Sequence, residues 1–169
     1  MPRVNTLLIV FCALLLSACG VSLHRRIAAV LDDVESYINE RPDRALAVLQ
    51  ELDSTRIRTL GTKAHYYLLL AIARDKNNQD DGHGLSGMEP AVAWYRRHGS
   101  LYDQTRACYY LADMQHNAGL IAEATVNYTR AFELAVDAHP NNTYNLSYST
   151  ITPLFLHYYI CRLIFSEYI

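Results

Sequence analysis

Apolar residues recur at helical spacing through most of the chain. In residues 27–39 they form one stripe of a helix, made of Ile27, Val30, Leu31, Val34, Tyr37 and Ile38. Pro42 and Asp43 then mark the start of a second helix. Further on, the pattern predicts one helix from about Gln104 to Asn117 and another from about Ile121 to Val136. The pattern therefore predicts an all-α fold.

Two short sequences occur twice, in the same order. "AHYYL" at 64–68 returns as "ACYYL" at 107–111, and "AVAWYRR" at 91–97 returns as "ATVNYTR" at 124–130. The earlier copy is longer because it contains the loop from Asn77 to Gly87, which is rich in Asn, Asp and Gly. Each copy therefore predicts a pair of antiparallel helices, and the chain contains an internal repeat.

Small residues occupy regular positions in the later copy, at Ala107, Ala112, Ala124 and Ala131. We expect them to let the two helices of the pair approach closely. Larger side chains would fill the space around them, namely Tyr110, Leu111, Tyr128 and Leu134. Gly119 lies between the helices, where we expect a turn with a positive φ.

The stretch from Gln104 to Asp137 resembles a tetratricopeptide repeat (TPR). The signature positions of that family fall on Leu111, Ala112, Gly119, Ala124, Tyr128 and Ala131. Cys108 and Gln115 depart from it, since the family favours aromatic residues there. An earlier half-copy, "RPDRALAVLQELD", carries Ala45 and Leu49 at the same spacing. The resemblance implies a TPR-like solenoid of about three helix pairs over residues 19–138.

The first residues, 1–18, have the layout of a signal peptide, with Arg3 followed by an apolar run and then small residues. Leu16-Ser17-Ala18-Cys19 resembles a bacterial lipobox, which implies a lipid on Cys19 and anchoring to a membrane of the cell envelope. The expected location is the outer membrane, with the domain facing the periplasm or the surface. An ordinary signal peptide and an uncleaved anchor are the alternatives.

The last segment, 139–169, breaks the pattern with a polar, Asn-rich stretch followed by "LFLHYYICRLIFSEYI". Three interpretations stay open. It is the first helix of a fourth repeat, a membrane-seeking helix, or the end of a truncated reading frame. The second is disfavoured by the short length and by His157 and Arg162.

The net charge and the residue spacing argue against nucleic-acid binding and against metal or catalytic chemistry. The net charge of -2 gives no basic field for nucleic acid. No pair of the seven histidines has zinc-protease spacing, and we interpret each as a surface or helix-end residue, with His98 at a helix C-terminus. Cys108 and Cys161 form no metal motif, and nothing in their spacing argues for a disulfide between them. We expect no enzyme activity, metal, cofactor or small-molecule substrate.

The resemblance also implies a peptide-binding groove lined by the first helix of each pair. When the groove positions of the family are transferred to this sequence one by one, they fall on Lys63, Tyr66, Arg74, Arg106, Tyr109, Asp113, His116 and Asn117, with Leu70 and Ala73 beside them. The function expected is a non-catalytic, membrane-anchored module that binds a peptide or helix of a protein partner. The alternatives are a truncated sensor or regulatory ectodomain and a glycan-binding uptake lipoprotein.

Overall fold

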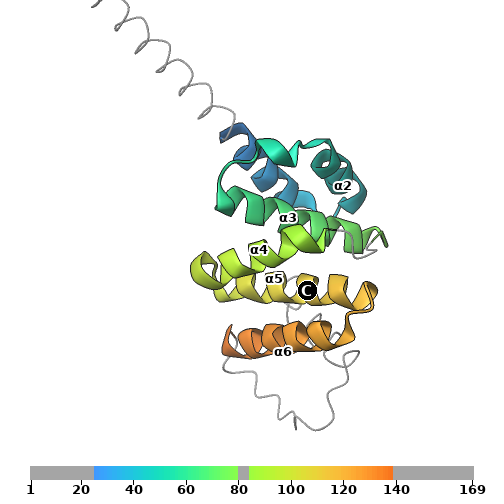
Figure 1. The fold of residues 1–169 in the computed structure, drawn as a ribbon. Coiled ribbons are helices and arrows are strands. Elements are labelled where there is room, and N and C mark those ends of the chain that lie inside the picture. Colours follow the sequence, from blue (N-terminus) through green and yellow to red (C-terminus); the bar gives the residue numbers. More distant parts are fainter. Residues whose placement is uncertain (1–24, 80–83, 139–169) are drawn as a thin grey trace, which may run out of the picture.

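The computed structural model describes residues 25–79 and 84–138 (Figure 1). Within these ranges the fold is all-α, without a strand. The predicted lipid site at Cys19 and the tail 139–169 lie outside the described residues. The helices are 25–37, α2 (Pro42–Glu51), α3 (Leu60–Lys76), α4 (Leu85–His98), α5 (Leu101–Asn117) and α6 (Ile121–Ala138), with a 3-10 turn, η1 (Ser54–Arg56).

The helices pack in the order of the sequence, as antiparallel pairs. Each of α2, α3, α4 and α5 contacts the next helix along the chain, and α5 and α6 share the most extensive interface. In addition, α3 contacts α5, so the first helices of successive pairs lie against each other. The result is a stack of helices along one direction, from the N-terminal helix to α6 (Figure 1).

The repeated small residues are buried in this stack. Ala45, Ala91 and Ala124 occupy corresponding places in α2, α4 and α6, and their exposed fractions are 0%, 2% and 0%. Four residues after each of them stands a buried larger side chain, in the order Leu49, Tyr95 and Tyr128. Ala107, Ala112 and Ala131 are also fully buried. The predicted interior role of the small residues is therefore confirmed.

The ends of the helices follow from local chemistry. Ser100 and Asp103 form a capping box at the start of α5: Ser100 Oγ accepts from the backbone N–H of Asp103, and the Asp103 carboxylate accepts from the backbone N–H of Ser100, each at 3.2 Å. Thr59 caps α3 by accepting a hydrogen bond from the backbone N–H of Thr62. Gly119 ends the turn after α5 with φ +78, which confirms the positive φ expected there.

The element boundaries differ from the predictions at a few places. The capping box makes α5 begin at Leu101, three residues before the expected Gln104. The loop after α3 is shorter than predicted, because Gly87 lies inside α4 instead of in the loop. The turn η1 was not predicted, and its cap is Asp53, which accepts a hydrogen bond from the backbone N–H of Thr55.

Candidate functional site

The predicted groove residues divide by exposure. Four are buried, namely Tyr66, Arg106, Tyr109 and Asp113. The other four are accessible, Lys63 and Arg74 partly and His116 and Asn117 largely. The four buried side chains do not form an open contact surface in this structure, which corrects the expectation that they line an accessible groove.

The burial follows from the position of α5 in the stack, since every residue from 105 to 115 is buried. The ring of Tyr109 packs edge-on against Tyr110 at 5.0 Å between centroids, and lies 5.8 Å from the ring of Tyr128 on α6. Tyr66 makes the same edge-on contact with Tyr67 at 5.2 Å. The Tyr109–Tyr128 contact joins α5 to α6, and Tyr66 and Tyr109 both belong to the hydrophobic core.

Glu35, His65 and Arg106 form a network that joins three helices. Arg106 Nη1 lies 2.7 Å from one carboxylate oxygen of Glu35, and His65 Nε2 lies 2.9 Å from the other. Glu35 belongs to the helix 25–37, His65 to α3 and Arg106 to α5. The guanidinium of Arg106 also lies 5.2 Å from the ring centroid of Tyr102. One carboxylate thus connects the first helices of all three pairs.

The network shifts the ionisation of its members. The hydrogen bond from His65 lowers the pKa of Glu35 to about 2, and the hydrogen bond and charge of Arg106 act in the same direction against the effect of burial. The pKa of Arg106 is raised: burial opposes the charged form, but the hydrogen bond and charge of Glu35, together with Tyr102 and Tyr110, more than offset it. Glu35 is therefore a carboxylate at neutral pH, and Arg106 carries its positive charge.

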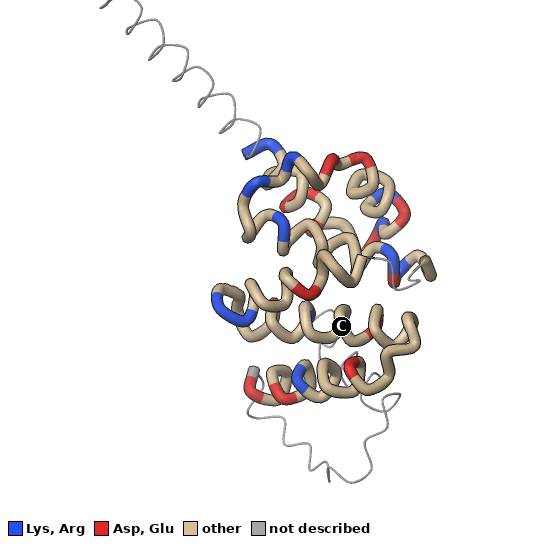
Figure 2. The backbone as a smooth tube through the Cα atoms, viewed as in Figure 1, with Lys and Arg blue, Asp and Glu red and all other residues tan. Residues whose placement is uncertain are grey.

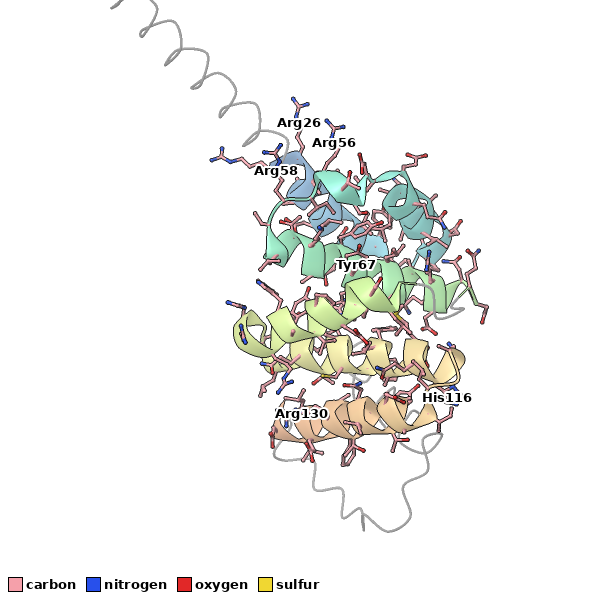
Figure 3. All side chains as sticks on the ribbon, in the orientation of Figure 1. Arg26, Arg56, Arg58, Tyr67, His116 and Arg130 are labelled. Carbon is pink, nitrogen blue, oxygen red and sulfur yellow. The ribbon has the colours of Figure 1, made fainter. Side chains whose placement is uncertain are left out.

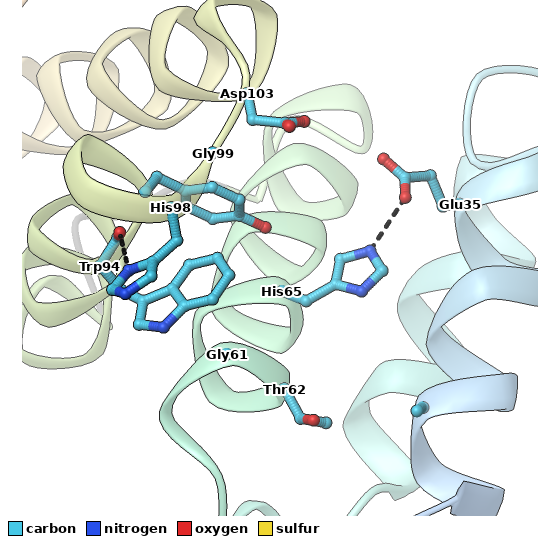
Figure 4. A pocket seen from close by; sticks show the side chains of 10 residues that line it. Glu35, Gly61, Thr62, His65, Trp94, His98, Gly99 and Asp103 are labelled. Carbon is cyan, nitrogen blue, oxygen red and sulfur yellow. Dashed lines mark hydrogen bonds and ion pairs between the residues drawn. The ribbon is translucent and has the colours of Figure 1, made fainter.

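A pocket of about 340 Å³ opens beside this network (Figure 4). Its lining comes from the helix 25–37, α3, the end of α4 and the start of α5, and includes Glu35, Thr62, His65, Trp94, Tyr95, His98 and Asp103. Burial raises the pKa of Tyr95, and the charge of Asp103 adds to that effect. The phenol is therefore neutral and can act as a hydrogen-bond donor. Aromatic, carboxylate and imidazole groups thus meet in one hollow.

The ring of Trp94 is held between close neighbours, His98 and Gly61. It stacks on His98, with ring centroids 4.8 Å apart and planes 19° from parallel, and His98 Nδ1 lies 3.0 Å from the carbonyl oxygen of Trp94. A Cβ added at Gly61 would lie 2.9 Å from the indole ring. Gly61 therefore provides the space in which the indole forms a wall of the pocket.

Sequence reasoning did not select most residues of this pocket. His98 does end α4 as predicted. His65 was interpreted as a surface or helix-end residue, but its side chain is only 21% exposed and bonded to Glu35. Glu35 carries no local signature, because its partners His65 and Arg106 are distant in the sequence. Asp103 does have a local partner, Ser100, but that capping box marks a helix start and does not indicate a pocket. The one usable signal was Trp94, the single tryptophan of the chain.

The described residues contain no group of three His, Cys, Asp or Glu side chains placed to hold a metal ion. Cys108 is a buried free thiol, and burial raises its pKa. It is therefore a core residue, in agreement with its position in the helical pattern. In the ranges that the structure describes, no helix has both the length and the apolar character needed to span a membrane.

Comparison with known proteins gives no relative. No family model, no curated protein and no solved structure matches this chain.

Proposed function

We propose that this chain is a non-catalytic, membrane-anchored interaction module of the TPR type. Three antiparallel helix pairs with matching buried positions, Ala45, Ala91 and Ala124, support the repeat assignment. Stacked pairs of this kind present long surfaces on which side chains of neighbouring repeats act together. The partner would be an extended peptide or a helix of another protein.

The observation that carries this proposal is the pocket of Figure 4. It collects side chains from all three helix pairs, and it combines the aromatic rings of Trp94 and Tyr95 with the polar groups of His65 and Asp103. Peptide contacts with large energetic effects are enriched in aromatic residues that sit in such pockets. The binding surface would therefore centre on this pocket, next to the accessible Lys63, and not on the buried Tyr109.

A peptide selection tests the binding proposal. A displayed library of random short peptides would be selected on the chain from residue 19 onward, and the recovered peptides measured by fluorescence anisotropy. We expect binding to fall at least about tenfold for Trp94→Ala and Thr62→Arg, which change the pocket wall. Val126→Arg on the exposed face of α6 is the matched control and should bind as the unmodified chain does. Recovery of no specific peptide would contradict the proposal.

The anchor is tested separately at Cys19. The lipobox resemblance of residues 16–19 supports a lipid there, and two or three acyl chains would hold the domain on a membrane. With a clickable fatty-acid label in a bacterial host, we expect label in the membrane fraction for the natural sequence and none for Cys19→Ser. Equal labelling of both would contradict the assignment, whatever the outcome of the peptide selection.

A further inference from the structure

A second pocket, of about 490 Å³, lies between α3 and α4. It runs along the facing stripes of the two helices, from Leu60 to Tyr67 on α3 and from Ser86 to His98 on α4. At a helical rise of 1.5 Å per residue, the stretch from Ser86 to Arg97 is about 16 Å long, enough for about five residues of extended chain. Trp94 and His98 also line the pocket of Figure 4, so their stacked rings separate the two pockets.

One end of this pocket is apolar. Tyr67, labelled in Figure 3, lines it together with Pro90 and Ala91. The two helices approach closely at Gly87, because a Cβ added there would clash with the ring of Tyr67. An apolar side chain of a partner would gain contact area here without displacing any charged group.

The other end is basic. Lys63 at the start of α3 and Arg97 at the end of α4 line the pocket together, since the helices are antiparallel. In Figure 2 the backbone is blue, the colour of Lys and Arg, at the turn where α4 ends. None of the lining residues, all of which belong to the described part of the chain, is Asp or Glu. The pocket therefore favours an anionic group at this end.

The backbone of α4 adds a hydrogen-bond acceptor. Pro90 lies inside the helix and has no N–H, so the carbonyl oxygen of Ser86, four residues before it, lacks the donor of the usual helical bond. Ser86 is exposed and lines the pocket. A ligand with an N–H group can supply this bond, and a fatty acid cannot. This acceptor favours a peptide over a lipid as the occupant.

We infer that the pocket between α3 and α4 binds a peptide segment of a protein partner in which a large apolar residue stands next to acidic residues. The apolar side chain enters beside Tyr67 and Pro90. The carboxylates pair with Lys63 and Arg97, and a backbone N–H of the segment donates to Ser86. The inference rests on the proposed interaction function and assigns the chemistry of the partner.

The test uses N-acetylated, C-amidated peptides in which Phe-Leu is followed by Glu-Glu, by Gln-Gln or by Lys-Lys. Binding to the chain from residue 19 onward would be measured by anisotropy or calorimetry at two salt concentrations. We expect the Glu-Glu peptide to bind at least about tenfold tighter than the Lys-Lys peptide, with the preference reduced at high salt. An analogue N-methylated along the backbone should bind more weakly, because it lacks the N–H groups.

Variants then locate the site. The double variant Lys63→Glu/Arg97→Glu should invert the charge preference. Ala93→Phe, at an exposed position that lines the pocket, should lower the affinity for all three peptides. Arg96→Glu is the matched control, since Arg96 is exposed, neighbours Arg97 and does not line the pocket. It should leave the charge preference unchanged. Circular dichroism would show that each variant keeps its helices.

Several outcomes would overturn the inference. They are equal binding of the three peptides, a charge preference that survives Lys63→Glu with Arg97→Glu, and tighter binding of oleate than of the Glu-Glu peptide. The proposed function is judged independently by the library selection. Peptides that depend on Thr62 but not on Lys63 and Arg97 would support the interaction module and reject this pocket as its site.

Discussion

The phenolic oxygen of Tyr128 donates a hydrogen bond to the carboxylate of Asp113 at 2.9 Å, inside the interface of α5 and α6. The two residues are 2% and 7% exposed. Asp113 was expected in an open groove, where its carboxylate would face a partner. In the structure the carboxylate instead helps to hold the two helices of the third pair together. A buried charge of this kind is stabilised only while its donors are present.

Tyr128→Phe should therefore lower the free energy of unfolding by about 1.5–3 kcal/mol, the usual range for a hydrogen bond to a charged group. Urea unfolding followed by circular dichroism measures the change. Asp113→Ala, whose side chain cannot accept the bond, and the double variant complete a cycle whose coupling energy isolates this pair. A coupling energy near zero would show that the bond contributes nothing to the stability of the stack.

Ala107→Glu tests the close packing of α5. Ala107 is fully buried, so the variant would bury a carboxylate that has no partner in a space made for a methyl group. We expect a loss of about 4 kcal/mol or more in unfolding free energy, with unfolding at ambient temperature as the extreme result. Val126→Glu, at a position on α6 that is 68% exposed, should change the stability by less than about 0.5 kcal/mol. Similar stability of the two variants would reject the register of α5 described here.

The sequence predicted the helix pairs because their signals are local. The spacing of Ala124 and Tyr128, the breaker Gly119 and the proline at Pro42 each act within a few residues, and each agrees with the structure. Repetition strengthened these signals, since the four-residue step from Ala91 to Tyr95 recurs from Ala124 to Tyr128.

The binding residues were harder to predict because exposure depends on distant parts of the chain. Tyr109 and Arg106 have the spacing of a groove, yet they are enclosed by neighbouring helices. Glu35 meets Arg106 across 71 positions of sequence. No periodicity within a helix reports such a contact. Both pockets are lined by residues of α3 and α4, so they could be identified only once the packing of these two helices was known.

Because Gly87 lies close to Tyr67, we expect a glycine-to-alanine change in this helix to destabilise the fold, the reverse of its usual effect. Alanine normally stabilises a helix relative to glycine by up to about 1 kcal/mol. At position 87, however, the new Cβ would lie 2.2 Å from the ring of Tyr67, so we expect Gly87→Ala to destabilise the fold by about 1–3 kcal/mol. In a Tyr67→Ala background the same change should stabilise it. Thermal unfolding of the unmodified chain, the two single variants and the double variant measures both effects.

Gly119→Ala is the control for this experiment. A Cβ there would meet nothing within 4 Å, but φ is +78, so the cost is backbone strain of about 1–2 kcal/mol. Tyr67→Ala should not relieve that cost. If Gly87→Ala destabilised both backgrounds equally, the steric contact with Tyr67 would not be the cause.

The pKa of Glu35 predicts how stability depends on pH. Hydrogen bonds from His65 and Arg106 lower it from 4.5 to about 2 in the folded chain. A lowered folded-state pKa stabilises the fold fully above about pH 4.5, and this contribution is lost as the pH falls towards about 2. Glu35→Gln should reduce stability at neutral pH by about 1 kcal/mol, a modest value because solvent screens a side chain that is 39% exposed.

The difference between Glu35→Gln and the unmodified chain should therefore shrink as the pH is lowered through this window. Urea unfolding at a series of pH values measures it. Glu133→Gln is the control: Glu133 lies 3.4 Å from Arg130, both side chains are about half exposed, and such surface pairs contribute little at any pH. A Glu35→Gln difference that stays constant down to acid pH would mean that the carboxylate is not what joins the helix 25–37 to α3 and α5. The connection would then depend on apolar packing around Leu31 and Val34, both of which are fully buried.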